Sequence, residues 1–341
     1  MRQVFRVRQY TRMTASPAFT RGATCLRRWL LLLCCLLPAG PAVADGVRVG
    51  NQYLLDASLA GEEREFQTPD GRELGYIAYT APGADTALVY LHGVESHAGW
   101  FAQAAILLRE RGYDVFCLDR RGSGINRGNR DFTPGHVDTF RVLLDDIHAF
   151  IAPLRERYRR VVLVGLSWGG KLAAAHALAW PGDADALVLI TPGFKALVDV
   201  GPLDKLKIVL FSQLSPESQV ASPIEPEMFT TTPRYLDYIE NDPLRLTHAT
   251  ARFYWQSNRL DAWLEDNIDR LDTPLLLFLA GRDRIIDNTG VIELLQRARL
   301  QEFEIIDYPE QTHSVQFDDP DRLVQDMDQW LQEAMTRDTD P

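Results

Sequence analysis

The stretch Gly165-Leu166-Ser167-Trp168-Gly169-Gly170 decides how the rest of the chain is interpreted. Residues 161–164, just before it, are Val-Val-Leu-Val, and residues 171–178, just after it, are rich in alanine. This order predicts a strand, a sharp turn and a helix, with Ser167 at the tip of the turn. The flanking glycines tolerate close backbone approach, and the helix start presents free N–H groups near the serine hydroxyl. The pattern also fits an ordinary turn, but its strand and helix context favours a nucleophilic serine.

The composition is typical of a soluble globular protein, with 46% hydrophobic and 24% charged residues in a chain of 341. This length suits one large α/β domain or two smaller ones. Residues 1–44 hold seven of the 36 basic residues and none of the 47 acidic ones, which leaves 29 basic and 47 acidic residues, a net charge of −18, in the remainder. Such an acidic body disfavours nucleic acid as a partner.

The first 44 residues have the pattern of an export signal. An arginine-rich start is followed by an apolar run at 29–37 and by Ala42-Val43-Ala44, an A-x-A cleavage pattern. The nine residues of this run are fewer than the roughly 20 that span a bilayer. We therefore expect an exported protein, periplasmic or secreted, with an uncleaved membrane anchor and an organellar transit peptide as alternatives. Cleavage would leave Cys117 as the single cysteine, in a buried-strand pattern typical of a core residue.

Short apolar runs alternate with helical patterns over residues 65–335, and this alternation predicts a mostly parallel sheet with helices on both faces. Eight strands are expected, at 65–68, 74–79, 87–91, 115–118, 161–164, 186–190, 274–279 and 303–306. Helices are expected at 100–110, 136–157, 289–299 and 320–334, in addition to the helix that follows Ser167.

Residues 194–272 interrupt this alternation with several prolines and with apolar, helix-like pieces at 206–214 and 249–255. A structureless loop of this length is uncommon in a compact domain. The segment therefore predicts a helical cap, or lid, between two core segments at 45–193 and 273–341. It would lie over the edge of the sheet at which open α/β folds bind ligands. A surface excursion with no role at the site is the alternative.

Two later residues could complete a catalytic group with Ser167. A nucleophilic serine needs a base and a group that orients the base. Asp283 follows one late strand and His313 follows the next, so the chain order is serine, aspartate, histidine. Asp287 is an alternative acid and His97 an alternative base. The remaining histidines are expected to be structural or solvated: His92, His136, His148, His176 and His248.

These motifs together resemble the α/β-hydrolase superfamily over residues 65–335, and within it the monoacylglycerol lipase and lysophospholipase branch, which is serine aminopeptidase-like. The resemblance implies an α/β-hydrolase fold with the catalytic residues Ser167, Asp283 and His313. Besides the Ser167 turn and His313, four motifs carry it: His92-Gly93-x-x-x-His97-x-Gly99, Asp119-x-Arg121-Gly122-x-Gly124, Gly135-His136-Val137 leading to Asp145-Asp146, and Gly281-x-x-Asp283.

The resemblance also implies roles for two loops. The backbone N–H groups of Val94 and Trp168 would form the oxyanion hole. Asp119 and Arg121 would hold the loop beside the Ser167 turn, which is a structural role. Where the branch usually reads His-Gly-x-Gly-Glu-His, residues 92–97 read His-Gly-Val-Glu-Ser-His.

Further side chains could face a substrate. Lys171, near the start of the helix after Ser167, is expected to pair with a carboxylate, because a cation is slightly unfavourable at a helix N-terminus. Six aromatic residues could line an acyl pocket, although each also fits an ordinary core position: Trp100, Phe101, Phe211, Phe229, Tyr254 and Trp255.

The sequence thus predicts an exported serine hydrolase that cleaves a carboxylic ester through an acyl-enzyme, with a monoacylglycerol or lysophospholipid as substrate. It leaves open a transient contact of the cap with membrane lipid. No Cys/His cluster for a metal and no G-x-G-x-x-G for a dinucleotide is present, so no cofactor is expected. The alternatives are a short-chain ester hydrolase, a non-catalytic envelope binding protein, and an aminopeptidase-like enzyme whose cap acids bind a substrate amine: Glu225, Glu227, Asp237 and Glu240.

Overall fold

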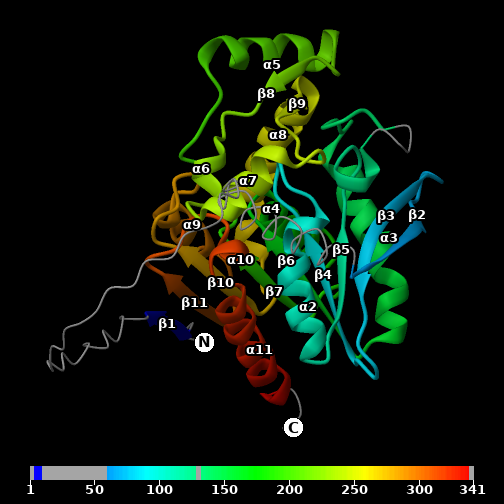
Figure 1. Ribbon diagram of the computed structural model, residues 1–341, viewed down its shortest axis with the longest axis vertical. Coiled ribbons are helices and arrows are strands. Elements are labelled where there is room, and N and C mark those ends of the chain that lie inside the picture. The colour runs from blue at the N-terminus through cyan, green and yellow to red at the C-terminus, as the bar shows by residue number, and fades with distance from the viewer. Residues whose placement is uncertain (1–3, 10–59, 128–131, 338–341) are drawn as a thin grey trace, which may run out of the picture.

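The computed structural model describes residues 4–9, 60–127 and 132–337, and a twisted sheet of nine strands runs through its centre (Figure 1). The strand order is β1-β11-β10-β7-β6-β4-β5-β3-β2. Strand β3 is antiparallel to both of its neighbours, and all other adjacent strands are parallel. The bounds are β1 (Val4–Gln9), β2 (Glu62–Gln67), β3 (Glu73–Tyr79), β4 (Thr86–Leu91), β5 (Asp114–Leu118), β6 (Arg160–Leu166), β7 (Ala186–Ile190), β10 (Leu275–Ala280) and β11 (Glu302–Tyr308).

The eight strands from β2 to β11 confirm the predicted mostly parallel sheet. Strand β1 adds a ninth, which the sequence pattern did not predict, because it falls in the arginine-rich start of the expected export signal. It pairs in parallel with β11, from Val4 opposite Glu302 to Gln9 opposite Asp307. This pairing satisfies backbone groups that an edge strand would otherwise leave open. The rest of the expected signal, including the apolar run at 29–37, lies outside the described residues.

The two faces of the sheet carry two hydrophobic clusters. Along β4, Leu88 and Tyr90 join one cluster, whereas Val89 and Leu91 join the other, as the alternation of side chains along a strand requires. The first cluster includes α2 (Ala102–Glu110) and α11 (Pro320–Arg337), which lie together on one side of the sheet in Figure 1. The second includes α3 (Phe140–Arg157), α4 (Trp168–Ala179) and α9 (Asn288–Leu295). Burial on both faces explains the continuous apolar runs in the central strands.

The segment between β7 and β10 rises above the carboxyl ends of the strands, at the top of Figure 1. Three of its helices begin with a proline, which suits the first helical position because that residue needs no N–H partner. Three of the six prolines that marked this segment in the sequence therefore start helices. Its elements are α5 (Pro202–Leu214), β8 (Gln219–Ala221), α6 (Pro226–Phe229), α7 (Pro233–Asn241), β9 (His248–Thr250) and α8 (Ala251–Asn267).

Two boundaries differ from the sequence-based expectation. Residues 248–250 form a strand paired with β8 rather than the start of a helix, because the Thr250 side chain accepts from the Phe253 N–H and so caps α8. Helix α3 begins at Phe140 rather than at 136, since the side chain of Thr139 caps it. The division of the chain into core and lid at 194 and 272 stays a prediction.

None of the described helices is both long enough and apolar enough to cross a membrane.

Candidate active site

Ser167 lies at the tip of the turn between β6 and α4, in a strained backbone conformation with φ 54° and ψ −122°. Positive φ is rare for a residue with a side chain, and it persists only when the surroundings enforce it. Here the carbonyl of Ser167 accepts from the N–H of Gly193 at 2.8 Å, and its own N–H donates to Ile190 at 2.9 Å. A Cβ at Gly169 would lie 2.0 Å from the carbonyl oxygen of Leu91, so only glycine fits the turn there.

His313 and Asp283 come together at the carboxyl ends of β11 and β10. The imidazole Nδ1 lies 2.8 Å from Oδ2 of Asp283, and both side chains are fully buried. Oδ1 of Asp283 accepts from the N–H groups of Ile285 at 2.8 Å and Ile286 at 3.0 Å. The carboxylate is thereby fixed, and Oδ2 remains for the imidazole. This arrangement places the ring proton on Nδ1 and leaves Nε2 as the basic nitrogen.

Nε2 of His313 is buried and has no hydrogen-bond partner among the described residues. Within the same part of the chain, the Ser167 hydroxyl and Nε2 are not hydrogen-bonded to each other. Such bonds are often long before substrate binds. Thr191, which also has positive φ at 42°, donates its hydroxyl to the carbonyl of His313 at 3.0 Å. His313 is thus held through both its ring and its backbone.

The two alternative residues have other partners. Asp287 accepts from the N–H of Thr289 at 3.1 Å and so caps α9. His97 places Nε2 2.9 Å from a carboxylate oxygen of Asp242 in the lid. The structure therefore brings Asp283, and not Asp287, to His313. The catalytic roles of Ser167, Asp283 and His313 stay a prediction at this point.

The two expected oxyanion donors, Val94 and Trp168, line the same cavity as Ser167. The backbone of the loop at residues 92–97 passes close to the serine: a Cβ built on Gly93 would lie 3.3 Å from Cβ of Ser167. Trp168 is the first residue of α4, where an N–H has no partner within the helix. This geometry allows both N–H groups to face an oxygen next to the serine.

The cavity above Ser167 has a volume of about 570 Å³, within the usual range for a small-molecule site. Its roof comes from the lid, with Ile208 of α5 and with Tyr254 and Trp255 of α8. Two of the six proposed aromatic lining residues are therefore present. Of the others, Phe229 has its ring centre 6.0 Å from that of the His313 ring. Phe101 is buried in the hydrophobic cluster that also contains α2 and α11.

Lys171 was expected to pair with a carboxylate, and the structure shows that this partner is Asp261 of α8. A carboxylate oxygen of Asp261 lies 2.6 Å from the ammonium nitrogen. Both residues line the cavity, and the Lys171 side chain is only 9% exposed. The sequence could not identify this partner, because the two residues lie on different elements far apart in the chain.

Two buried charge pairs join the loop at residues 92–97, called the oxyanion loop here after the role expected for Val94, to the lid. Glu95 pairs with Arg245 at 2.7 Å, and His97 with Asp242 at 2.9 Å. Burial would raise the pKa of Asp242, but the hydrogen bonds from His97 and Trp100 hold it below its usual value. Burial would likewise lower the pKa of His97, and Asp242 more than offsets this and raises it. The lid segment after α7 is therefore anchored beside the site.

Asp119 and Arg121 hold the neighbouring loop, in keeping with the structural role expected for them. Asp119 accepts from the N–H groups of Ala98 at 2.7 Å and Ile125 at 2.9 Å. Arg121 forms ion pairs with Asp70 and Asp146, each at 2.6 Å. Across the described residues, no group of three or more His, Cys, Asp or Glu side chains is placed to hold a metal ion.

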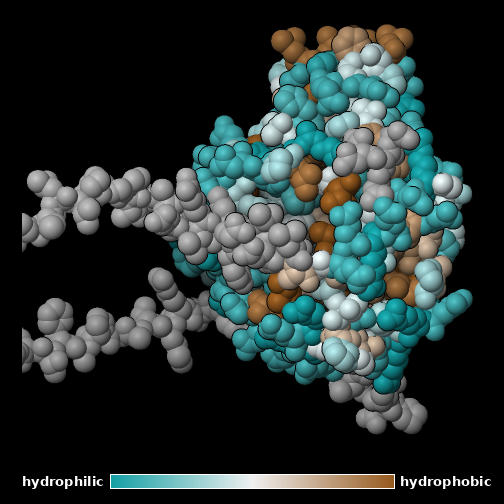
Figure 2. Space-filling view, turned by 45° about the vertical axis from the view of Figure 1, so that its right-hand side comes forward, coloured by the Kyte–Doolittle hydropathy of each residue, from teal (hydrophilic) through white to brown (hydrophobic). Residues whose placement is uncertain are grey.

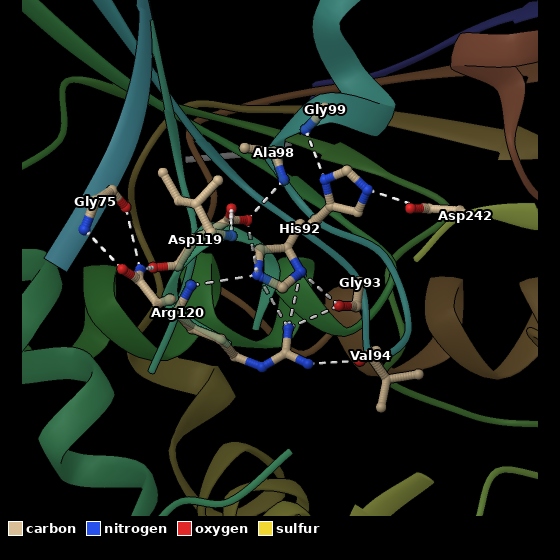
Figure 3. A network of polar contacts seen from close by, with 12 residues as sticks. Gly75, His92, Gly93, Val94, Ala98, Gly99, Asp119, Arg120 and Asp242 are labelled. Carbon is tan, nitrogen blue, oxygen red and sulfur yellow. Dashed lines mark hydrogen bonds and ion pairs between the residues drawn. The ribbon is translucent and has the colours of Figure 1, made fainter. Parts of the chain in front are cut away.

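One residue that the sequence pattern did not single out is Arg120. Its guanidinium contacts the carbonyl oxygens of Gly93 and Val94 from below the oxyanion loop (Figure 3). Its neighbour Arg121 matched a motif, whereas position 120 is unspecified in that motif. Only the contacts reveal it.

The family model described as "Serine aminopeptidase, S33" matches residues 82–321. A monoacylglycerol lipase of Mycolicibacterium smegmatis is 26% identical over 286 residues, which cover 80% of this chain and 98% of that protein. Lysophospholipase L2 of Escherichia coli is 25% identical over 67% of this chain and 72% of its own length. The crystal structure of a monoacylglycerol lipase from Paleococcus ferrophilus superposes with a TM-score of 0.68 at 19% identity, and covers 76% of this chain and 99% of that one.

Proposed function

The chain belongs to the serine aminopeptidase S33 family and is a serine ester hydrolase of the α/β-hydrolase fold, and we propose that it cleaves single-chain lipid esters, monoacylglycerols or lysophospholipids, through an acyl-enzyme on Ser167. The observation that carries this proposal is the Asp283–His313 pair, whose Nε2 has no partner among the described residues. It accompanies a strained serine that lines a cavity with an apolar roof.

In the proposed mechanism, the Ser167 hydroxyl attacks the carbonyl carbon while Nε2 of His313 takes its proton. The N–H groups of Val94 and Trp168 stabilise the negative oxygen of the tetrahedral intermediate. Collapse of the intermediate breaks the ester bond, and the leaving alcohol takes the proton from Nε2. Water, deprotonated by the same nitrogen, then attacks the acyl-serine and releases the fatty acid. Asp283 stabilises the imidazolium in both steps.

The outer face of α5 supports a lipid substrate and a transient contact of the lid with membrane lipid. Four leucines of this helix are between 48% and 83% exposed, namely Leu203, Leu206, Leu210 and Leu214. Figure 2 shows apolar residues gathered at this end of the molecule. Soluble proteins rarely expose such contiguous apolar surface without a binding role. The inner face of the same helix contributes Ile208 to the roof of the cavity, so lipid at the outer face would lie near the site.

The charges in the cavity favour an ester over an amine substrate. The four acidic lid residues that could have bound an amine are absent from the described cavity lining. The two carboxylates that do line it are each paired with a lysine, Asp261 with Lys171 and Asp199 with Lys205. Neither carboxylate is therefore available to bind the ammonium group of an amine substrate.

Export to the periplasm or beyond is also part of the proposal, on the pattern of residues 1–44 alone. N-terminal sequencing of the protein recovered from outside the cytoplasm tests it. A new N-terminus after Ala44 would support a cleaved signal, and an intact N-terminus would contradict one.

The experiment for the activity compares the unaltered full-length protein with its Ser167→Ala variant on one substrate panel. The panel holds short acyl esters, long-chain monoacylglycerols, lysophospholipids and aminoacyl amides, and kcat/KM is measured for each. We expect the highest values for the long single-chain lipids, with a loss on the order of 10⁶ in the variant. A variant that keeps most of the activity would refute the mechanism, and a preference for short esters or amides would refute the lipid substrate.

A further inference from the structure

Arg120 follows β5 and lies buried beneath the oxyanion loop. Its Nη1 donates to the carbonyl of Gly93 at 2.7 Å, and its Nη2 donates to the carbonyl of Val94 at 2.5 Å. Figure 3 shows the guanidinium against both carbonyls and beside the ring of His92. The planar fork of an arginine suits two neighbouring acceptors in this way.

The first of these hydrogen bonds helps to hold the direction of the proposed donor, the Val94 N–H, and Nδ1 of His92 lies 2.8 Å from the same carbonyl oxygen. The carbonyl of Gly93 and the N–H of Val94 belong to one peptide unit, and the described residues contain no cis peptide bond. In a trans peptide the carbonyl and the N–H point in opposite directions. With the carbonyl directed at Arg120, the N–H of Val94 is directed away from it. Gly93 itself lies close to Ser167, since a Cβ built on Gly93 would lie 3.3 Å from Cβ of the serine.

Arg120 also contacts the other side of the oxyanion hole. Its guanidinium carbon lies 5.1 Å from the centre of the Trp168 ring and 5.4 Å from the centre of the Phe253 ring. Cations are attracted to aromatic faces at such distances. Trp168 supplies the second N–H donor, and both rings line the cavity. One side chain thus contacts the residues that carry both donors.

The charge of Arg120 has no ion-pair partner in the described part of the chain. Asp119, whose charge acts on Arg120, already accepts from two backbone N–H groups. Burial lowers the pKa of Arg120 to about 9, so the group is still a cation at neutral pH. A buried, unpaired cation is unfavourable in the resting protein. A negative oxygen in the hole above it would offset that cost, because charges interact strongly in a site that excludes water.

We propose that Arg120 is a positioning residue for the oxyanion hole, which orients the Val94 N–H and places a buried positive charge beneath the developing oxyanion. The inference rests on the proposed function, since it assumes that Ser167 forms the tetrahedral intermediate. It predicts that Arg120 acts on the transition state and hardly on the bound substrate.

Arg121 provides a matched control on the adjacent position. It is buried like Arg120, but its guanidinium pairs with the carboxylates of Asp70 and Asp146 rather than with the oxyanion loop. The variants are Arg120→Met, which removes hydrogen bonds and charge, Arg120→Lys, which keeps the charge, and Arg121→Lys. Thermal unfolding of each variant shows whether it folds.

Three readouts are measured: kcat and KM on a soluble p-nitrophenyl ester, the inhibition constant of an alkyl boronic acid, and the rate at which a fluorophosphonate labels Ser167. For Arg120→Met we expect a loss in kcat of about 10²-fold with KM nearly unchanged. We expect the affinity for the boronic acid to fall in parallel, because its tetrahedral adduct imitates the intermediate. Arg120→Lys should recover part of both losses, and Arg121→Lys should lower the unfolding temperature but leave kcat unchanged.

A folded Arg120→Met or Arg120→Lys variant with normal kcat and normal boronic acid affinity would overturn the inference. An equal loss of kcat in Arg121→Lys would do so as well, because the effect would then reflect damage to the loop. If Arg120→Met does not fold, Arg120→Lys decides alone. Failure of the fluorophosphonate to label Ser167 in the unaltered protein would instead refute the proposed function.

Discussion

The floor and the roof of the cavity are built in different ways. The floor is the edge of the sheet beneath the cavity, where Ser167, Asp283 and His313 each follow a strand. Ser167 lines the cavity itself, and all three residues are held by hydrogen bonds that involve the backbone. The roof is helical, and its helix α5 packs on α8 while it turns an apolar face outward. The reaction requires atoms held to within a fraction of an ångström. A flexible acyl chain requires only apolar surface. The rigid floor therefore suits the proposed reaction, and the helical roof suits binding of the substrate.

The largest effect is expected on the floor, from Asp283→Asn. An amide at this position would donate to Nδ1 of His313, so the ring proton would move to Nε2, which could then no longer accept from Ser167. We expect kcat to fall by about 10⁴-fold, as for the equivalent change in a serine protease. Steady-state kinetics measure this loss. Asp287→Asn is the matched control, since Asp287 only caps α9; a comparable loss there would contradict the assignment of the acid.

A smaller effect is expected where the lid is anchored to the floor, from Asp242→Asn. This change removes the charge that His97 and Trp100 contact, and the side chains of both His97 and Asp242 are buried. We expect a loss of about 2 kcal/mol in the free energy of unfolding at pH 5.5, which is typical for a hydrogen bond to a charged group. Urea unfolding measures it. Glu240→Gln removes an exposed charge from α7, which ends just before Asp242, and should have little effect.

The pH dependence of this loss is a sharper test. The folded protein raises the pKa of His97 above 6.5, so its contribution is complete below that pH and is lost as the pH rises through the raised value. It lowers the pKa of Asp242 below 3.8, so that contribution is complete above that pH and is lost as the pH falls through the lowered value. The difference from Asp242→Asn should therefore be largest between about pH 4 and pH 6. A difference that grows towards pH 9 would contradict the pair.

The smallest effect is expected at the roof, from Leu203→Ser on the most exposed large hydrophobic residue of α5. If this face enters lipid, the lost apolar area should weaken binding to phosphatidylcholine vesicles by about fivefold, or roughly 1 kcal/mol. Vesicle co-sedimentation measures the change. Hydrolysis of a short soluble ester should be unaffected, and so should the unfolding temperature, because the side chain is 83% exposed. Unchanged vesicle binding would argue against lipid contact through α5.

The sequence predicted those parts of the molecule that depend on short-range patterns. Apolar runs located the eight strands, and Ser167, Asp283 and His313 followed from motifs at the strand ends. The links between the loop and the lid could not be predicted, because Glu95 and Arg245 are far apart in the chain and their charges alone suggest exposed residues. Arg120 was missed for a related reason. Its partners are backbone carbonyls, which every residue possesses, so no pattern of side chains reveals the contact.

The strained backbone at the site limits how stable this protein can become. Among the described residues, the two with positive φ that are not glycine are Ser167 and Thr191, at the ends of adjacent strands. Such conformations cost about 1–3 kcal/mol each. Glycine at either position would relax the chain, but it would remove the proposed nucleophile at one and the hydroxyl that holds His313 at the other. Directed evolution for heat resistance would therefore have to stabilise the protein at other positions, because relaxing either strained residue would remove a side chain that the proposed reaction uses.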